Sequence, residues 1–216
     1  ALFGGLWIEN VANQIKNSNF KGNVWPINPH RKSIAGYKCF QDISDLPGVP
    51  DAAFIGVNRT KTLEILTKLY EVGCGGATCF AAGFSEVDKY GKQLQKKLSK
   101  ASKDMPFLGP NCYGYINYLD HIHMWPDQHG GKRVEKGVAI IAQSSNIAIN
   151  LTMNTRSTPI AYVLTTGNQE KIDMSDLGLA MINDKRVTAI GMYIEGFKDI
   201  KKFERMAFSA LRSNIP

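Results

Sequence analysis

Short apolar runs alternate with amphipathic segments along the first half of the chain. The runs, each as long as a short buried strand, occupy residues 1–3, 24–27, 52–57, 77–81 and 107–108. Between them, apolar residues recur at helical spacing over residues 8–17, 60–70 and 87–102. Strands that alternate with helices in this way predict βαβ units, and hence an α/β domain built on a doubly wound parallel sheet.

The alternation stops near residue 118 and resumes after residue 136. Residues 119–136 have no apolar period and are rich in turn-forming residues, which indicates an interdomain connection. The second set of elements comprises strands at 138–142, 160–165 and 187–194 and helices at 146–155, 175–182 and 200–211. The sequence therefore predicts two doubly wound α/β domains, over residues 1–118 and 137–216.

The two ends of the sequence lead us to expect a longer polypeptide. Ala1 already lies in an apolar run that reaches its glycine turn at Gly4, which leaves no room for the first half of a strand. Residues 213–216 have the composition of a loop that leads into a further strand. We therefore expect the second domain to be incomplete at its C-terminal end.

Composition narrows the class of protein. With 216 residues, 44% of them hydrophobic, the chain can bury one large core or two modest ones. No apolar run approaches the roughly 20 residues of a membrane span, and no basic region precedes the first apolar stretch. The four cysteines, Cys39, Cys74, Cys79 and Cys112, share no C-x-x-C spacing and have apolar neighbours. We expect a cytoplasmic protein that has no membrane partner.

The formal charge of +7 does not by itself indicate nucleic-acid binding. Much of it comes from one helical pattern, and such a pattern is typical of a solvated helix face. Since no aromatic residues interleave with the basic ones, we expect no nucleic-acid partner. The charge favours an anionic small ligand through electrostatic steering. The lysines of this pattern are Lys89, Lys92, Lys96, Lys97, Lys100 and Lys103.

Ligands of open parallel sheets bind beyond the carboxyl ends of the strands. At that edge of the first domain, Gly4 and Gly5 permit a close backbone approach to a phosphate at the following helix, although a purely structural turn explains them equally well. Arg31, after the turn at Asn28-Pro29, suits a forked phosphate contact or is simply part of an exposed basic turn. Because an NAD site has an acidic residue there, a ligand with a ribose phosphate, such as CoA or NADP, is favoured.

Three motifs resemble the acyl-CoA synthetases of the NDP-forming type, the superfamily of succinyl-CoA synthetase. They are Leu-Gly-Pro-Asn-Cys-Tyr-Gly-Tyr-Ile-Asn at 108–117, Ala-Ile-Ile-Ala-Gln-Ser-Ser-Asn at 139–146 and Tyr-Ile-Glu-Gly-Phe at 193–197. The resemblance implies a Rossmann-like CoA-binding domain, followed by an incomplete flavodoxin-like, succinyl-CoA ligase-like domain. The CoA-binding positions that it implies are Gly4, Gly5, Trp7, Asn28, Pro29, Arg31, Gly56, Val57, Asn58, Ala82, Gly83, Phe84 and Asn111.

The resemblance also implies catalytic positions in the second domain. Ser144, Ser145 and Asn146 open a helix whose N-terminus suits a phosphate or acyl phosphate, and a plain serine N-cap is the alternative. The family usually has glycine in place of Ser145, so a serine there is strained if the position requires a positive φ. Glu195 matches the glutamate that orients the family's phosphohistidine. The remaining positions are Gly167 and Asn168, whereas Asp173 and Asp176 are interpreted as helix caps.

The overall reaction that the resemblance implies converts an acid, CoA and NTP into acyl-CoA, NDP and phosphate, through an acyl phosphate and a phosphohistidine. None of the four histidines fits the phosphohistidine, which we expect in a segment after Pro216. ATP and Mg²⁺ are expected only with an ATP-grasp domain or subunit, so this fragment alone is expected to be inactive. We predict no metal site, because His121, His123 and His129 have no matching ligands around them.

Two other functions stay open at this point. A stand-alone, non-catalytic CoA-binding module would need neither the histidine nor a glycine at position 145. An NADP-dependent oxidoreductase would explain Arg31 and the glycine turn, but not the loops of the second domain. The acid and the choice of ATP or GTP are not specified by the sequence. The exposed rim of an incomplete second domain predicts an oligomer or poor solubility.

Overall fold

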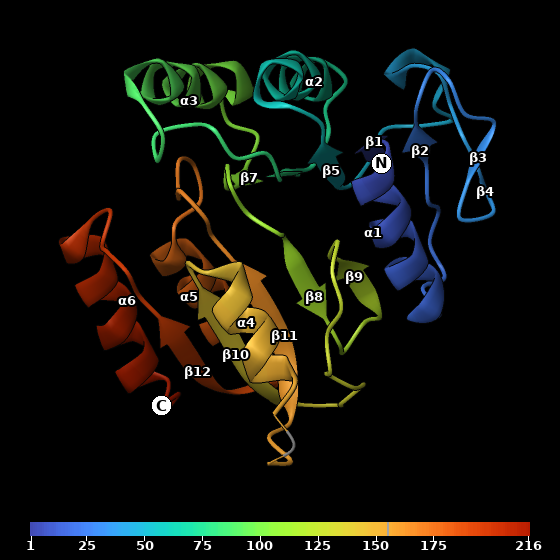
Figure 1. Cartoon of the computed structure of the whole chain (residues 1–216). Helices are drawn as coiled ribbons and strands as arrows, with labels where there is room; N and C mark the ends of the chain where they lie inside the picture. Colours follow the sequence, from blue (N-terminus) through green and yellow to red (C-terminus); the bar gives the residue numbers. More distant parts are fainter. Residues whose placement is uncertain (155) are drawn as a thin grey trace.

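A computed structural model describes residues 1–154 and 156–216. Two five-stranded sheets, one in each half of the chain, are flanked by helices (Figure 1). The predicted α/β class is therefore confirmed. Thr155, at the end of the helix predicted over 146–155, lies outside the described residues.

The first sheet is entirely parallel, with the strand order β2-β1-β5-β6-β7. Its strands are buried on both faces, which explains why they consist of continuous apolar runs. Leu2 and Phe54 face helix α1, whereas Phe3 and Ile55 face α2 and α3 on the other side of the sheet. The strands are β1 (Leu2–Gly4), β2 (Pro26–Ile27), β5 (Ala53–Gly56), β6 (Ala77–Cys79) and β7 (Phe107–Leu108).

The helices of this half are α1 (Leu6–Asn17), α2 (Arg59–Glu71) and α3 (Lys89–Ser102). Helix α1 begins two residues earlier than the predicted 8–17, and α3 begins two residues later than the predicted 87–102, because Asp88 caps it. Two small elements were not predicted, a hairpin of β3 (Ser33–Ile34) and β4 (Tyr37–Lys38) and the 3₁₀ turn η1 (Ile43–Asp45).

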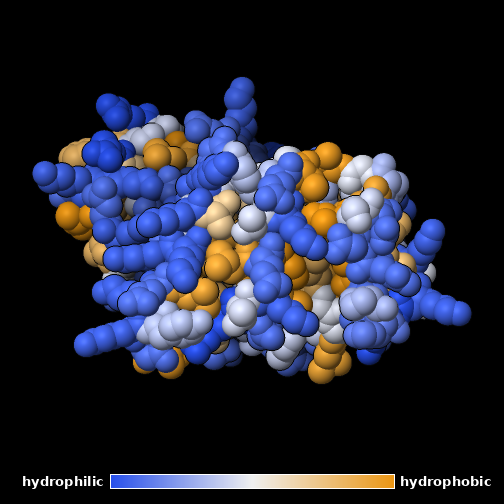
Figure 2. Space-filling view, turned by 90° about the horizontal axis from the view of Figure 1, so that it is seen from above, coloured by the Kyte–Doolittle hydropathy of each residue, from blue (hydrophilic) through white to orange (hydrophobic). Residues whose placement is uncertain are grey.

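The lysines of α3 point into solvent, as the charge pattern predicted. Leu94 and Leu98 of this helix are buried, whereas Lys89, Lys92, Lys96, Lys97 and Lys100 are exposed. Figure 2, which views the molecule from the side of α2 and α3, shows long hydrophilic side chains covering much of this surface. The pattern is that of an ordinary amphipathic helix.

The second sheet has the order β12-β10-β11-β8-β9. Strands β10, β11 and β12 are parallel, whereas β8 pairs antiparallel with both β11 and β9. The strands are β8 (Tyr115–Asn117), β9 (Ile122–Met124), β10 (Gly137–Ala142), β11 (Ile160–Thr165) and β12 (Val187–Tyr193). The helices are α4 (Ser145–Thr152), α5 (Met174–Ile182) and α6 (Ile200–Arg212), of which α5 begins with the predicted capping box of Asp173 and Asp176.

Strand β9 lies in the stretch 119–136 that showed no period, and β8 lies just before it, at the end of the predicted first domain. Neither was predicted, since strands of three residues are too short to reveal a period. It packs between the two halves of the chain. Ser18 Oγ of the first half donates a hydrogen bond to the His121 carbonyl at 2.6 Å, and Gln14 Nε2 donates to the Asp127 carbonyl at 2.7 Å. The domain limits at residues 118 and 137 remain a prediction.

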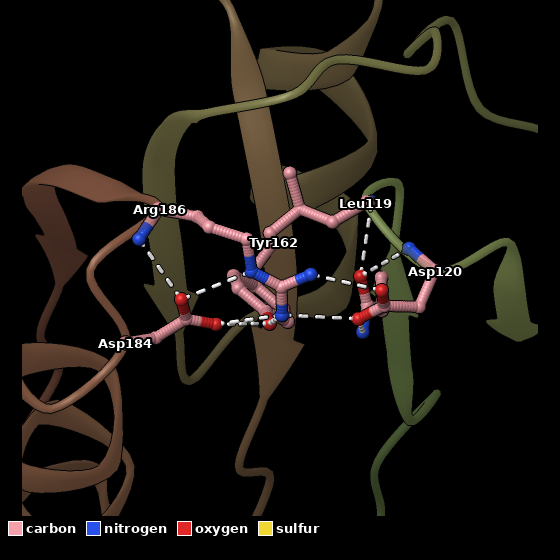
Figure 3. A network of polar contacts seen from close by, with 6 residues as sticks. Leu119, Asp120, Tyr162, Asp184 and Arg186 are labelled. Carbon is pink, nitrogen blue, oxygen red and sulfur yellow. Dashed lines mark hydrogen bonds and ion pairs between the residues drawn. The ribbon is translucent and has the colours of Figure 1, made fainter.

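A cluster of charged side chains ties the turn of the hairpin, at Asp120, to the segment just before β12 of the same sheet. Figure 3 shows the Arg186 guanidinium between Asp184 and Asp120, beside Tyr162. Arg186 Nη1 lies 2.8 Å from Asp120 Oδ1, and its Nη2 lies 2.9 Å from Asp184 Oδ2. The Tyr162 hydroxyl donates to Asp184 at 2.7 Å.

None of the described helices combines the length and apolar character needed to span a bilayer.

Candidate functional site

A cavity of about 420 Å³ lies where the carboxyl ends of the two sheets meet. Both halves of the chain contribute to it, and seven of the predicted site residues line it. Those from the first half are Trp7, Ala82 and Asn111, and those from the second are Ser144, Ser145, Asn146 and Glu195. Phe80, Tyr113 and Gln143 also line the cavity, although they were not predicted as site residues.

The N-terminus of α4 forms one wall of the cavity. Ser144 is its N-cap, and the Ser144 hydroxyl accepts a hydrogen bond from the Ile147 N–H at 3.5 Å. Free backbone N–H groups and the helix dipole at this end favour an anion. Ser145 is the first helical residue and is not among the residues with positive φ. The strain considered for a serine at this position therefore does not arise.

Glu195 reaches the cavity from the end of β12. The Gln143 side-chain oxygen accepts hydrogen bonds from the backbone N–H groups of Glu195 and Gly196, the latter at 2.8 Å. Gln143 thereby fixes the loop that carries the carboxylate to the end of β10. The exposed Glu195 side chain is available to a partner group, and its role as an orienting carboxylate stays a prediction.

Aromatic rings form another wall of the cavity. Trp7 lies over Phe80 with ring centroids 4.8 Å apart, and Phe80 lies 5.5 Å from Tyr113. Tyr113 continues the row inward to Trp125, at 5.4 Å. The Tyr113 backbone N–H donates to Ser145 Oγ at 3.3 Å, which joins the aromatic wall to the N-terminus of α4.

The glycine turn after β1 has a structural requirement of its own. Gly4 has a φ of +142° and pairs with Gly56 of β5, and a Cβ at Gly4 would lie 2.5 Å from the Gly56 carbonyl oxygen. Asn28 Nδ2 donates to the Gly4 carbonyl at 2.7 Å, and Asn28 Oδ1 accepts from the His30 N–H at 2.9 Å. The turn is thus built by five predicted CoA-binding residues that do not line the cavity, namely Gly4, Gly5, Asn28, Pro29 and Gly56.

Arg31 has a partner that the sequence did not indicate. Its Nη1 lies 2.6 Å from Glu9 Oε2, and both side chains are partly exposed. A ligand phosphate at Arg31 would therefore compete with a carboxylate in water, where such ion pairs are weak. The predicted phosphate contact remains compatible with this geometry.

The loop after β6 is held by its own side chains. Glu86 Oε1 accepts hydrogen bonds from the N–H groups of Gly83, at 2.6 Å, and Phe84, at 3.2 Å. Burial alone would raise the pKa of Glu86, but these bonds and one from Asn168 lower it. The Phe84 side chain is completely buried, so only its backbone is available to a ligand.

Four more of the predicted site residues lie outside the lining of this cavity, namely Asn58, Val57, Gly167 and Asn168. Asn58 caps α2 by accepting from the Lys61 N–H at 3.0 Å, and Val57 packs against the first core.

Asn168 donates to Gln95 at 2.9 Å and to Glu86, both in the first half of the chain. A Cβ at Gly167 would lie 2.3 Å from the Asn111 carbonyl oxygen. Gly167 and Asn168 therefore hold the two halves together in this structure.

Two other observations bear on the choice of site. A cavity of about 410 Å³ at the amino edge of the first sheet is lined mostly by apolar groups, among them Ala77, Phe107 and Leu164. Its lining includes Asp176 in the first turn of α5, but the Asp51 and Asp176 carboxylates in that lining disfavour a phosphate. Within residues 1–154 and 156–216, no three His, Cys, Asp or Glu side chains are placed to hold a metal ion.

Comparisons with known proteins agree with the motif resemblance. Residues 8–118 match the family described as "CoA binding domain", and residues 135–216 match the "Succinyl-CoA ligase like flavodoxin domain". An ADP-forming acetate–CoA ligase of Methanocaldococcus jannaschii is 31% identical over 198 residues, 88% of this chain and 27% of the relative. A trans-feruloyl-CoA synthase from an unknown prokaryotic organism is 27% identical over 213 residues, 95% of this chain and 30% of the relative.

A solved structure extends the agreement to three dimensions. The dinucleotide-forming acetyl-coenzyme A synthetase 1 of Ca. Korarchaeum cryptofilum superposes with a TM-score of 0.83 at 28% identity, over 94% of this chain and 44% of that one. This chain spans less than a third of the length of the two curated relatives. It belongs to the CoA-binding family, and it joins a CoA-binding domain to the succinyl-CoA ligase-like flavodoxin domain, as the ADP-forming acyl-CoA synthetases do.

Proposed function

We propose that this chain is the CoA-binding portion of an ADP-forming acyl-CoA synthetase, and that the CoA thiol meets the acyl group in the cavity between its halves. The observation that carries the proposal is that one cavity gathers predicted CoA-binding and catalytic positions, from Trp7 to Glu195. The complete reaction would convert a carboxylic acid, CoA and ATP into acyl-CoA, ADP and phosphate. The curated relatives are named for different acids, among them acetate and ferulate.

The residues would divide the work as follows. The loops at Gly4–Gly5, Asn28–Arg31, Gly56–Asn58 and Ala82–Phe84 would bind CoA at the carboxyl edge of the first sheet. Ser144, Ser145 and Asn146 would stabilise the phosphate of an acyl phosphate through the N-terminus of α4. Glu195 would orient a phosphohistidine, with Gln143 holding its loop in place.

The NTP half-reaction would require groups from elsewhere. We propose that an ATP-grasp domain or subunit, with ATP and Mg²⁺, and a phosphohistidine segment complete the enzyme, so that this portion alone does not turn over. Exposed apolar side chains on α6, among them Phe208 and Leu211, support the expected association with further protein.

Calorimetric titration with CoA, 3′-dephospho-CoA and NADPH tests the proposal. We expect CoA to bind ahead of the dephospho form, and NADPH to give no signal. Silence with CoA together with binding of NADPH would identify a dinucleotide site instead.

Arg31→Glu tests the contact with the ribose phosphate. We expect the affinity for CoA to fall about tenfold, the loss of one charge-assisted phosphate contact, with little change for 3′-dephospho-CoA. Lys32→Glu is the matched control, because it makes the same change of charge at the adjacent exposed residue. If the Arg31 variant loses the same affinity for CoA and for 3′-dephospho-CoA, Arg31 does not contact the ribose phosphate.

A further inference from the structure

The two walls of the cavity differ in chemistry. One carries amide, hydroxyl and carboxylate groups around the N-terminus of α4, and the other carries the rings of Trp7, Phe80 and Tyr113. The rings follow one another at centroid distances of 4.8 and 5.5 Å. A ligand that fills this cavity therefore meets a polar, anion-stabilising end and a flat apolar side.

The aromatic wall is held in place from behind. Phe54, which is fully buried, packs against Phe80 at 5.6 Å, and the fully buried Trp125 packs edge-on against Tyr113 at 5.4 Å. The hydrogen bond from the Tyr113 N–H to Ser145 fixes the distance between the two walls. A surface organised in advance loses little conformational entropy when a ligand binds.

Core packing does not account for the position of Trp7. The buried face of α1 consists of Ile8, Val11, Ala12 and Ile15, whereas Trp7 is 41% exposed. Its ring lies over Phe80 at the cavity instead of entering the core. An exposed tryptophan beside a polar cavity is typical of a ligand contact, because its ring offers a large apolar surface.

We infer that the acid accepted by this site carries a planar aromatic acyl group, which stacks on Trp7, Phe80 and Tyr113; the inference rests on the proposed function. The carboxyl carbon has to lie at the N-terminus of α4, where an acyl phosphate is stabilised. The group attached to that carbon then extends into the remainder of the same cavity, along the aromatic wall. An acetyl group would leave this wall uncovered.

Calorimetric titration of the chain with CoA, acetyl-CoA, hexanoyl-CoA and cinnamoyl-CoA tests the inference. Cinnamoyl-CoA is expected to bind about tenfold more tightly than acetyl-CoA, or ~1.4 kcal/mol, and more tightly than hexanoyl-CoA, which is apolar but not planar. If CoA binds and the three thioesters bind equally, the inference is overturned while the proposed function stands. If CoA itself does not bind, both are overturned.

Ring-removing variants locate the effect. Trp7→Leu and Phe80→Leu keep apolar side chains but remove a ring, and each is expected to reduce the preference for cinnamoyl-CoA over hexanoyl-CoA about fivefold. Trp7→Phe keeps a ring and is expected to retain most of the preference. Phe208→Leu removes an exposed ring of α6, outside the cavity lining, and is expected to leave the preference unchanged. An equal loss for CoA and cinnamoyl-CoA in Trp7→Leu would assign the rings to CoA and overturn the inference.

Discussion

At the scale of single residues, the closest constraints come from backbones that approach one another. Gly4 and Gly56 occupy paired positions of β1 and β5, and Asn28 bonds to the turn that they form. The sequence indicated the turn, but it left open whether its glycines serve a ligand or the fold. The structure shows that Gly4 is required by the fold, whatever ligand lies above it.

Gly4→Ala is expected to lower the free energy of unfolding by about 2 kcal/mol, because a Cβ would meet the Gly56 carbonyl oxygen and the φ of +142° disfavours any side chain. Gly5→Ala is the matched control, since a Cβ there meets nothing within 4 Å, and about 0.5 kcal/mol or less is expected. Urea unfolding measures both. Similar losses of unfolding free energy in the two variants would show that the close approach of β1 and β5 does not require a glycine at position 4.

His123 illustrates how burial affects titration. Burial, and then the neighbouring His129 and His121, lower the pKa of His123 to about 4. Its Nδ1 has no hydrogen-bond partner among the described residues. Because the unfolded chain binds the proton more tightly, the stability that this residue contributes is present above its unfolded pKa of about 6.5 and falls as the pH drops toward 4.

His123→Phe keeps a ring but removes this titration. We expect the free energy of unfolding of the variant to depend less on pH between about 4 and 6.5 than that of the parent chain. The free energies of the variant and the parent chain should differ less at pH 7 than at pH 4. Urea unfolding over a pH series measures the effect. His30→Phe, at an exposed position, serves as the control for the histidine-to-phenylalanine exchange itself. An unaltered profile in His123→Phe would contradict the assignment.

At the scale of elements, caps and ion pairs decide where helices begin and how strands are joined. Asp88, Ser144 and Asp173 cap α3, α4 and α5. The residue types of Ser144 and Asp173 indicated where their helices begin, whereas Asp88 was not recognised as a cap and the start of α3 was predicted two residues too early. The β8–β9 hairpin had no comparable signal. Its position depends on pairing with β11 and on Arg186, whose partner Asp120 is 66 residues away in sequence.

Arg186→Met should loosen the hairpin. The Arg186 guanidinium lowers the pKa of both Asp184 and Asp120, and its removal leaves these carboxylates without their cation. Because the cluster is partly exposed and screened by water, we expect a loss of about 1 kcal/mol at pH 7, together with faster hydrogen exchange in residues 115–124. Lys185→Met, at an exposed neighbouring position, provides the control. Equal exchange rates in the two variants would contradict a role for Arg186 in holding the hairpin.

At the scale of the whole molecule, the candidate site exists only because the two halves are docked. Asn168 donates across the boundary to Gln95 and Glu86, and Gln95 Nε2 donates to Glu170 at 2.8 Å. These contacts lie beside the cavity and hold the carboxyl edges of the two sheets together. Gly167 and Asn168 thus have an observed structural role, whereas their predicted catalytic role remains a prediction.

Asn168→Ala is expected to weaken the docking. Loss of its hydrogen bonds should lower the free energy of unfolding by about 1–2 kcal/mol, and CoA affinity should fall because the cavity is shared between the halves. Urea unfolding and calorimetry measure the two effects. Asn183→Ala is the matched control, since among the described residues the amide of Asn183 bonds within its own helix end, to the Leu179 carbonyl. If CoA affinity is unchanged in Asn168→Ala, the contacts that dock the two halves through Asn168 are not required for CoA binding.

Local patterns in the sequence were enough to predict the fold class, most elements and the family. Alternating apolar runs gave the α/β class and nearly every parallel strand, and cap residues and glycines gave helix starts and turns. The motifs at 108–117, 139–146 and 193–197 gave the family, which the comparisons confirm. These signals are readable because each depends on residues close together in the chain.

The way in which these elements meet became apparent from the folded chain alone. The fold brought Trp7, Phe80 and Tyr113 into one row of rings and placed Glu195 in the lining of the same cavity, so that residues from both ends of the chain share one site. It also paired Arg31 with Glu9 and assigned Asn168 to the boundary between the halves. Such contacts depend on strand order and on the packing of distant side chains, which no periodicity in the sequence records.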